Sequence, residues 1–329
     1  MAPYTASTPI DELVKDYSEI IKGKTILTTG VTPKSLGATF VEATAAGSPK
    51  LLILAGRNAS KLEELSQTIA SAHPGVKTRK LVVDLSSLDS VRKAAEEVNS
   101  WEDVSNIDVV VNNAGIMAIP YSATADGFEL QFAAGHIGHF LLTNLIMDKI
   151  LASPAPRVIN VSSNGHSLGP VRPYDPHFSK GETYDRWRAY GQVKSANMLF
   201  SVSLAQKLAT RGLQSFSVHP GLIMTTGLGN HLDFTSMDKD LGDFVQAHRD
   251  RGHIEGWEFF KAVPAEVGAA THAFGAFDPN IKASNGAYLL ESRVSDPYTD
   301  TVKSWARDPI EADKLWKLSE ELVGQKFSY

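Results

Sequence analysis

A tyrosine and a lysine stand four residues apart in the segment Tyr190-Gly-Gln-Val-Lys194. On a helix this spacing puts both side chains on one face, one turn apart. An ammonium group beside a phenol favours the phenolate, so Lys194 is expected to lower the pKa of Tyr190 from its ordinary value near ~10. A phenol prepared in this way can exchange a proton with a substrate oxygen. The same spacing also arises by chance on amphipathic helices, with the tyrosine half-buried and the lysine solvated.

The elements that must position this pair alternate along the chain. Short apolar or β-branched runs are separated by helical patterns, which is typical of a parallel sheet covered on both faces. We therefore predict a single α/β domain at 23–329, a Rossmann-type doubly wound sheet of about seven strands. An N-terminal extension, 1–22, carries a helix at 9–22, and a further helix spans 309–323. The predicted strands are 24–29, 51–55, 78–84, 107–112, 157–162, 214–219 and 286–290.

Residues 225–263 interrupt this alternation. The segment is rich in glycine, aspartate, histidine and aromatic residues. It follows the carboxyl end of a predicted strand, which is the edge where doubly wound sheets bind their ligands. We interpret it as a substrate lid and not as a second domain.

Composition narrows the function classes. The 329 residues are 43% hydrophobic with a net charge of −5, and no run of lysine and arginine suggests binding of nucleic acid. The absence of cysteine excludes disulfides, thiolate chemistry and cysteine-based zinc sites. No run approaches 18 apolar residues and the first residues lack an apolar core of signal length, so we expect no membrane span and a cytoplasmic enzyme. The choice between monomer and homodimer stays open.

A glycine-bearing turn follows the first predicted strand and runs into a helical pattern. Such a turn presents free backbone N–H groups and the positive end of the helix dipole to a pyrophosphate. Glycines at this spacing can also serve only the turn and its packing. The residues expected to bind the dinucleotide here are Gly30, Thr32, Lys34, Ser35, Leu36 and Gly37.

Three further strand ends complete the expected cofactor site. Arg57, after the second strand, stands where this fold reads the adenosine ribose, and a cation there favours the 2′-phosphate of NADP(H). An ordinary surface arginine is the alternative. Asp84 and Leu85, after the third strand, are expected at the adenine, although Asp84 could instead cap a helix. After the fourth strand, the small residues that would let the backbone approach the cofactor are Asn113, Ala114 and Gly115.

Together these motifs resemble the short-chain dehydrogenase/reductase family, over roughly residues 23–323. The resemblance is greatest to its retinol-dehydrogenase-like branch, which includes WW-domain oxidoreductase and protochlorophyllide-reductase relatives and many fungal homologues. Its marks are Gly30 and Gly37, Asn112-Asn113-Ala114-Gly115, Gly138-His139-Phe140-Leu141-Leu142-Thr143, Val161-Ser162-Ser163, Tyr190 to Asn197 and His219-Pro220-Gly221.

The resemblance implies a role for each catalytic residue. Ser163 would bind the substrate oxygen, Tyr190 would exchange its proton, and Lys194 would lower the pKa of Tyr190 and hold the nicotinamide ribose. Ser162 is the rival of Ser163, but in the family the second serine of the pair faces the substrate. The residues implied at the nicotinamide end of the cofactor are Pro220, Gly221, Ile223 and Thr225.

Two positions depart from the family pattern. The glycine turn is one residue longer, with Ser35 at the middle glycine, where we expect its N–H to survive as a phosphate donor and its hydroxyl to add another. Gly135 stands where the family has an asparagine that relays protons to Lys194. One account is that the missing amide leaves room for an ordered water. The other is that proton resupply is impaired.

We therefore expect an NADPH-dependent oxidoreductase acting on the carbonyl or alcohol of a bulky apolar small molecule. The alternatives are a non-redox dinucleotide-binding regulatory protein, and a cyclase or dehydratase that uses Tyr190 as an acid. No metal is expected, since His136 and His139 suit helix packing better than metal binding. Aromatic residues of the two expected substrate walls are Tyr174, Phe178, Tyr184 and Trp187, and Phe234, Phe244, Trp257, Phe259 and Phe260.

Overall fold

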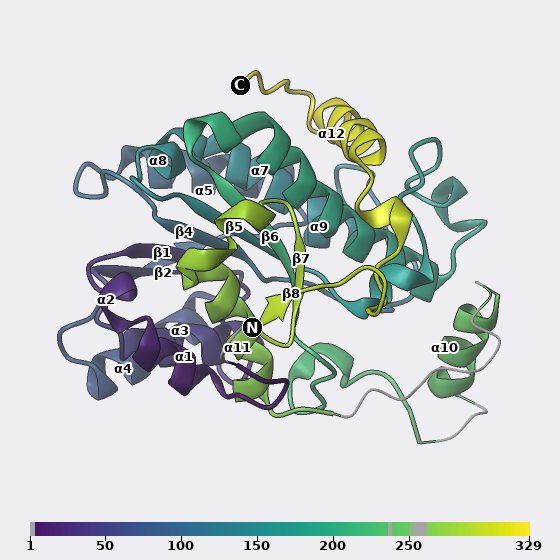
Figure 1. Cartoon of the computed structure of the whole chain (residues 1–329). Helices are drawn as coiled ribbons and strands as arrows, with labels where there is room; N and C mark the ends of the chain where they lie inside the picture. Colours follow the sequence, from purple (N-terminus) through teal and green to yellow (C-terminus); the bar gives the residue numbers. More distant parts are fainter. Residues whose placement is uncertain (1–3, 236–238, 251, 253–261) are drawn as a thin grey trace.

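A computed structural model of the chain describes residues 4–235, 239–250, 252 and 262–329. Its centre is one eight-stranded sheet in the order β3-β2-β1-β4-β5-β6-β7-β8 (Figure 1). Every neighbouring pair is parallel except β7 and β8, which are antiparallel. The strands are β1 Thr25–Thr29, β2 Leu51–Gly56, β3 Lys77–Val82, β4 Val109–Asn112, β5 Arg157–Val161, β6 Gln214–His219, β7 Tyr288–Leu290 and β8 Arg293–Val294.

Helices cover both faces of the sheet. The α-helices are α1 Ile10–Asp16, α2 Ser18–Ile21, α3 Leu36–Ala45, α4 Ala59–Ala72, α5 Leu88–Ser100, α6 Leu130–Phe132, α7 Gly138–Leu145, α8 Met147–Leu151, α9 Arg186–Leu208, α10 Asp240–Arg249, α11 Ala265–Phe277 and α12 Pro309–Val323. Between α6 and α7, one π-helical turn spans Ala133–Ile137. A 3₁₀ helix, η2, spans Asn164–Leu168 just after β5.

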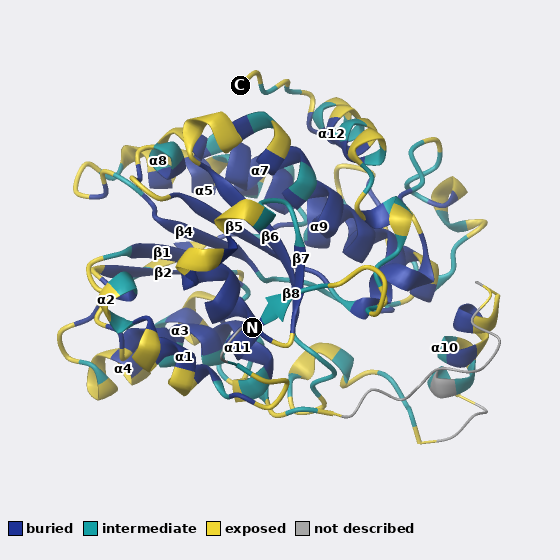
Figure 2. Cartoon of the chain, viewed as in Figure 1, coloured by how far each residue is buried: buried dark blue, intermediate teal, exposed yellow. Residues whose placement is uncertain are grey.

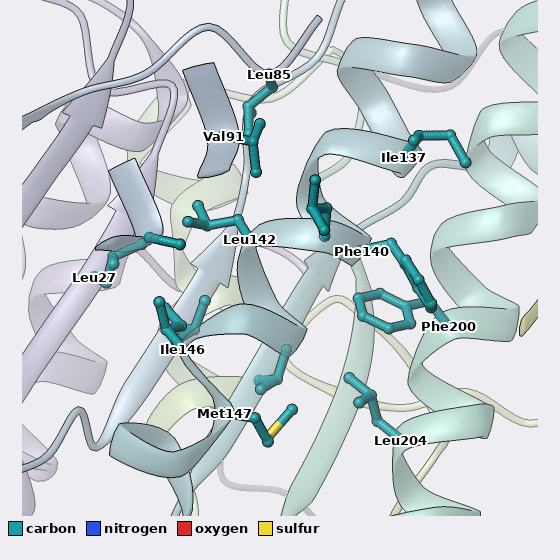
Figure 3. Close-up of a cluster of buried hydrophobic side chains, with 14 of the residues drawn as sticks. Leu27, Leu85, Val91, Ile137, Phe140, Leu142, Ile146, Met147, Phe200 and Leu204 are labelled. Atoms are coloured by element: carbon teal, nitrogen blue, oxygen red, sulfur yellow. The ribbon is translucent and has the colours of Figure 1, made fainter. Parts of the chain in front are cut away.

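The two faces have separate apolar cores. One core joins the sheet to α5, α7, α9 and α12, and the other joins it to α1, α3, α4 and α11. The central strands are buried along their length (Figure 2), which explains why β2 reads as an unbroken apolar run. In the first core, Leu142 and Phe140 of α7 point toward Leu27 and Phe200 (Figure 3), with the two phenylalanine ring centroids 5.5 Å apart.

The predicted fold class and the single doubly wound domain are confirmed, and the helix at 309–323 has the predicted bounds. Asp308 caps that helix, Pro309 occupies its first turn, and Gly324 ends it with a φ of +65°. The helix predicted at 9–22 is interrupted at Tyr17, where it divides into α1 and α2. The eighth strand was not predicted, because two residues are too few to give a pattern.

The segment predicted as a lid is described only in part. Residues 225–235 form a loop with a short 3₁₀ helix, and α10 then packs on α9 and η2. In Figure 1, α10 lies at the right, apart from the helices that cover the sheet. The aromatic residues Trp257, Phe259 and Phe260 lie outside the described residues.

Candidate active site

The two serines after β5 have different partners. The Oγ of Ser162 is buried and donates to the backbone oxygen of Lys194 at 2.7 Å. The Oγ of Ser163 accepts from the N–H of Gly165 at 3.0 Å, and its hydroxyl interacts with that of Tyr190. Ser162 therefore holds helix α9 against the sheet, while Ser163 lies at the phenol.

The ring of Tyr190 is buried against a glycine that the sequence did not single out. A Cβ added to Gly165 would lie 2.6 Å from Cε1 of Tyr190 and 3.4 Å from Oγ of Ser163. Only glycine lets the backbone approach the ring this closely while its N–H holds Ser163. No pattern around Gly165 signalled this role, because the contact joins η2 to α9 in three dimensions only.

Lys194 lies beside the phenol at the same edge of the sheet. Its Nζ donates to the backbone oxygen of Val161 at 3.0 Å and stands 5.4 Å from the centroid of the Tyr190 ring. Burial lowers the pKa of Lys194 to about 8, so the ammonium keeps most of its charge at neutral pH.

The pKa of Tyr190 shifts in the direction opposite to the one expected from the spacing. Burial raises it to about 12, and the hydrogen bond from Ser163 offsets only part of that effect. The physical reason is desolvation, since the ring is almost completely enclosed and the phenolate loses its water. The neighbouring ammonium is directed at Val161 and not at the phenolic oxygen.

The glycine turn is held by Ser35 in a way the sequence did not predict. The Oγ of Ser35 donates to the oxygen of Gly30 at 3.0 Å and accepts from the N–H groups of Thr32 and Ala38, both at 3.1 Å. Its own N–H donates to the oxygen of Thr32 at 2.9 Å. The N–H and the hydroxyl of Ser35, which we expected to bind a phosphate, thus both donate to backbone oxygens within the longer turn. The N–H groups of Leu36 and Gly37 remain without an intrahelical acceptor at the start of α3.

The two expected glycines allow the turn to pack on the end of β4. Gly30 has a φ of +72°, and a Cβ there would lie 2.7 Å from Cα of Ala114. A Cβ on Gly37 would lie 2.6 Å from Nδ2 of Asn113. Asn113 itself donates to the oxygen of Thr29 at 2.8 Å. The structure therefore brings the predicted turn and the predicted small residues after β4 together.

At the expected adenosine end, the cations are exposed. Arg57 follows β2 and Lys34 lies in the glycine turn with a φ of +66°. Within the described part of the chain neither is in an ion pair. The turn adjoins the end of β2, because the N–H of Gly30 donates to the oxygen of Ala55 at 2.9 Å.

Asp84 and Leu85 lie just beyond β3, which ends at Val82 and not at residue 84 as predicted. Asp84 accepts from the N–H and hydroxyl of Ser86, and helix α5 is capped by Ser87 instead. The half-buried Asp84 is thus an Asx-type turn residue and not the helix cap that was its alternative. The backbone oxygen of Leu85 packs closely on Gly138. A Cβ added to Gly138 would lie 2.2 Å from that oxygen.

The residues expected at the nicotinamide end follow β6. Pro220, Gly221 and Ile223 are half-buried, whereas Thr225 is exposed. Gly221 has a φ of +86°, and the segment is tied to Val263, whose N–H donates to the oxygen of Leu222 at 2.9 Å. The structure puts them at the same sheet edge as Ser163.

Gly135 sits inside the π-helical turn and faces α9. A Cβ added there would lie 2.4 Å from Cγ1 of Val193, so the space that we expected to admit a water is filled by a side chain. The side of Gly135 that faces α9 therefore has no room for the ordered water of the first account. The oxygen of Gly135 lies 3.3 Å from Nδ1 of His139.

The two histidines of that motif, His136 and His139, have different hydrogen-bond partners. Nε2 of His139 lies 2.8 Å from Oγ1 of Thr29, and Nε2 of His136 lies 2.8 Å from Oγ of Ser319. Burial lowers both pKa values, to about 4 for His139 and about 3 for His136. Both rings thus connect helices and strands, and the described residues contain no group of three or more side chains suited to a metal.

The expected substrate walls are only partly assembled. Trp187 packs on Phe234 and Phe244, with ring centroids 6.1 Å and 4.8 Å away, in a cluster that also contains Tyr190. Tyr184 packs on Phe178, while Tyr174 is 99% exposed and belongs to no wall. An apolar cluster of side chains from α9, α10 and the loop before α10 therefore includes the ring of Tyr190.

Comparison with known proteins gives the family. Residues 24–174 match the family described as short chain dehydrogenase. Retinol dehydrogenase 14 of Mus musculus is 32% identical over 315 residues, covering 93% of this chain and 87% of its own length. The chain belongs to the short-chain dehydrogenase/reductase family. It falls in the retinol-dehydrogenase-like branch of these oxidoreductases, as the sequence predicted.

Two other relatives extend the comparison. Short-chain dehydrogenase TIC 32 B, chloroplastic, of Brassica napus is 35% identical over 281 residues, covering 83% of this chain and 80% of its own. The crystal structure of an uncharacterized protein from Mycobacterium paratuberculosis gives a TM-score of 0.69 at 29% identity, covering 94% of this chain and 96% of its own. L-sorbose reductase from Gluconobacter frateurii, solved with NADPH and L-sorbose, shares the fold at a TM-score of 0.61 and 20% identity, over 82% of this chain and 95% of its own.

Members of this family bind a nicotinamide dinucleotide, and the residues here suit one. The glycine turn and the free N–H groups at the start of α3 suit a pyrophosphate. A Cβ added to Gly115 would lie 3.7 Å from Nζ of Lys194 and, apart from the adjoining residues, within 4 Å of no other described atom, so Gly115 leaves space beside the ammonium. Across the described residues, no helix is both long and apolar enough to cross a membrane.

Proposed function

We propose that this chain is an NADPH-dependent oxidoreductase that transfers hydride between the nicotinamide and a carbonyl or alcohol of a bulky apolar small molecule. The observation that carries the proposal is the contact of the Ser163 hydroxyl with Tyr190, with the Lys194 ammonium beside the same ring. These three groups can hold an oxygen and move a proton to or from it.

The dinucleotide would be held by the turn from Gly30 to Gly37, by Asn113, Ala114 and Gly115, and by the segment from Pro220 to Thr225. Lys194, facing the open space at Gly115, would bind the ribose. When bound, the cofactor supplies or accepts the hydride. The preference for NADPH is supported by Arg57, by Lys34 in the turn, neither of which is in an ion pair with a described residue, and by the absence of an acid at the end of β2.

The protein groups would act in concert during reduction. Ser163 accepts from the N–H of Gly165, and its own proton, directed at Tyr190 in this structure, would be donated to the substrate oxygen when a substrate binds between the two hydroxyls. Tyr190, whose pKa of about 12 keeps it protonated at neutral pH, would give its proton to that oxygen as it becomes an alkoxide. Reduction would leave Tyr190 as a phenolate, which the ammonium of Lys194 would stabilise. In oxidation that phenolate would accept the proton of the substrate alcohol.

The apolar character of the substrate is supported by Trp187, Phe234 and Phe244 next to Tyr190. The cytoplasmic location expected from the sequence stays a prediction, as does the role of residues 225–263 as a lid.

The test is NADPH oxidation with a panel of aryl and alicyclic ketones and aldehydes, using the wild type and Tyr190→Phe. We expect turnover by the wild type and a loss of at least a hundredfold in kcat in the variant, with the NADPH dissociation constant within about twofold. Lys194→Ala should lower kcat and weaken NADPH binding, because its ammonium stabilises the phenolate and binds the ribose. Near-wild-type turnover by Tyr190→Phe would show that Tyr190 is not the acid.

A further inference from the structure

The indole N–H of Trp187 has no hydrogen-bond acceptor among the residues that the structure describes. Trp187 is 2% exposed, and no described residue accepts from its Nε1. Buried indole N–H groups usually find a partner, and leaving one unpaired is costly. Trp305 shows the ordinary case, since its Nε1 lies 3.3 Å from the oxygen of His166 and 3.2 Å from Oγ of Ser195.

The position of Trp187 relates the unpaired donor to the catalytic group. Trp187 precedes Tyr190 by three residues on α9, so both side chains lie on the same face of the helix. Both belong to the apolar cluster with Leu168, Ala118 and Ala247. A molecule whose reacting oxygen lies at Tyr190, and which extends along α9 toward its start, would have its far end near Trp187.

A cavity of about 390 Å³ borders Trp187 on the side of α10. It is lined by Pro120, Tyr184 and Ala247 and by the carboxylates of Asp185, Asp243 and Asp250. Arg186, the one arginine among the described residues that line the cavity, is bound at 2.5 Å by each of Asp240 and Asp243. The described lining thus carries excess negative charge, which disfavours a carboxylate or phosphate on the substrate.

We propose that Trp187 is a substrate-binding residue whose indole N–H donates to a second oxygen of an uncharged carbonyl compound, the first oxygen lying at Ser163 and Tyr190. This inference rests on the proposed function and narrows its substrate class to apolar molecules with two separated oxygens. The N–H is shielded from solvent, so the proposal requires neighbouring side chains of α10, such as those of Phe244 and Ala247, to move when the substrate binds.

Two ketones of equal heavy-atom count provide the probe. Para-diacetylbenzene has a second carbonyl oxygen, and para-isopropylacetophenone has a methyl group in its place. Trp187→Phe keeps a large ring and removes the N–H. We expect it to raise KM for para-diacetylbenzene at least about fivefold more than for para-isopropylacetophenone, because one neutral hydrogen bond is lost. Comparing the variant with the wild type for each ketone cancels their different intrinsic reactivities.

Trp101→Phe is the matched control, since Trp101 stands at the end of α5 over Arg79. Trp101→Phe should leave KM unchanged for both ketones. Equal changes in KM for both ketones with Trp187→Phe would show that Trp187 acts only through packing and would overturn the proposal.

A second measurement separates this inference from the proposed function. In protein saturated with NADP⁺ and labelled with ¹⁵N-tryptophan, the Trp187 indole signal is the one missing from Trp187→Phe. Para-diacetylbenzene should shift it downfield, and para-isopropylacetophenone should not. If the wild type reduced neither ketone but the shift appeared, the reductase proposal would fail and the binding role would stand. A signal that responded to neither ketone, or to both alike, would mean that a water or no group pairs with the N–H.

Discussion

Val193 on α9 occupies the space in front of Gly135, and a Cβ on Gly135 would lie 2.4 Å from Cγ1 of Val193 but 3.7 Å from its Cβ. The first distance is a severe clash, whereas the second is ordinary contact. Glycine at 135 and valine at 193 are therefore a matched pair across the π-helical turn and α9. The polar group of the family's asparagine has been replaced here by an apolar contact.

This pair predicts a coupled effect on stability. Gly135→Ala alone should lower the free energy of unfolding by about 1–3 kcal/mol through overpacking, despite its better helix propensity. Val193→Ala alone should lower it by about 1–2 kcal/mol by leaving a cavity. The double variant removes Cγ1 and leaves two β-carbons in contact, so a coupling of at least about 1 kcal/mol is expected from urea unfolding. If the effects of the two substitutions on stability were additive, the π-helical turn would be moving away from Val193 instead of clashing with it. Gly135→Asn alone meets the same obstacle, so its activity would report damage to the fold.

The sequence predicted the sheet, its helices and most residues around the site because those features leave local patterns. Apolar runs marked the central strands, and Asp308, Pro309 and Gly324 marked both ends of α12. Motif spacing identified the site residues Ser163, Tyr190 and Lys194. The resemblance supplied their roles.

What the sequence could not predict depends on contacts between distant segments. Gly165 supports Tyr190 across η2 and α9, and Val193 fills the space at Gly135, yet neither pair has a sequence pattern. The pKa of Tyr190 was expected to fall because spacing shows the lysine and not the burial. The extra residue in the glycine turn likewise gave no sign that Ser35 would bond to the turn itself.

The two serines after β5 should separate by function. Ser163→Ala removes the hydroxyl beside Tyr190, and loss of such a donor to a reacting oxygen typically costs a factor of about 10²–10³ in kcat. Ser162→Ala removes the bond to the oxygen of Lys194 and should cost about 1 kcal/mol of stability, with kcat reduced less than about tenfold. Steady-state kinetics and thermal unfolding of both variants provide the comparison. The reverse order in kcat would make Ser162 the substrate-binding serine.

Arg57 should give the protein its preference for NADPH over NADH. Because a charge-assisted bond contributes about 1.5–3 kcal/mol, Arg57→Ala should weaken NADPH binding about 10- to 100-fold and leave NADH binding within about twofold. Fluorescence titration with both cofactors measures this. Lys50, exposed at the opposite end of β2, provides the control variant Lys50→Ala. Equal affinities of the wild type for the two cofactors would contradict the assignment.

His166 should make the protein less stable in acid. Its Nε2 accepts from the N–H of Lys303 at 3.2 Å, so its Nδ1 carries the proton and donates to the oxygen of Ser163 at 2.8 Å. Burial lowers its pKa to about 4, below the ordinary 6.5. Between these values the unfolded chain binds more protons, so the free energy of unfolding falls as pH falls, by about 2 kcal/mol from pH 7 to 5 for this ring.

Other buried histidines act in the same direction, including His139, so the contribution of His166 must be isolated by substitution. His166→Gln removes the titrating ring but keeps an acceptor for the N–H of Lys303. Urea unfolding at pH 7 and pH 5 should therefore show a loss of stability about 2 kcal/mol smaller in this variant than in the wild type. His73→Gln, at the end of α4, should keep the full wild-type loss. If His166→Gln had the same pH dependence as the wild type, His166 would bind protons equally in the folded and the unfolded chain. The bond that ties Ser163 to the segment at Lys303 would then not be the acid-sensitive contact.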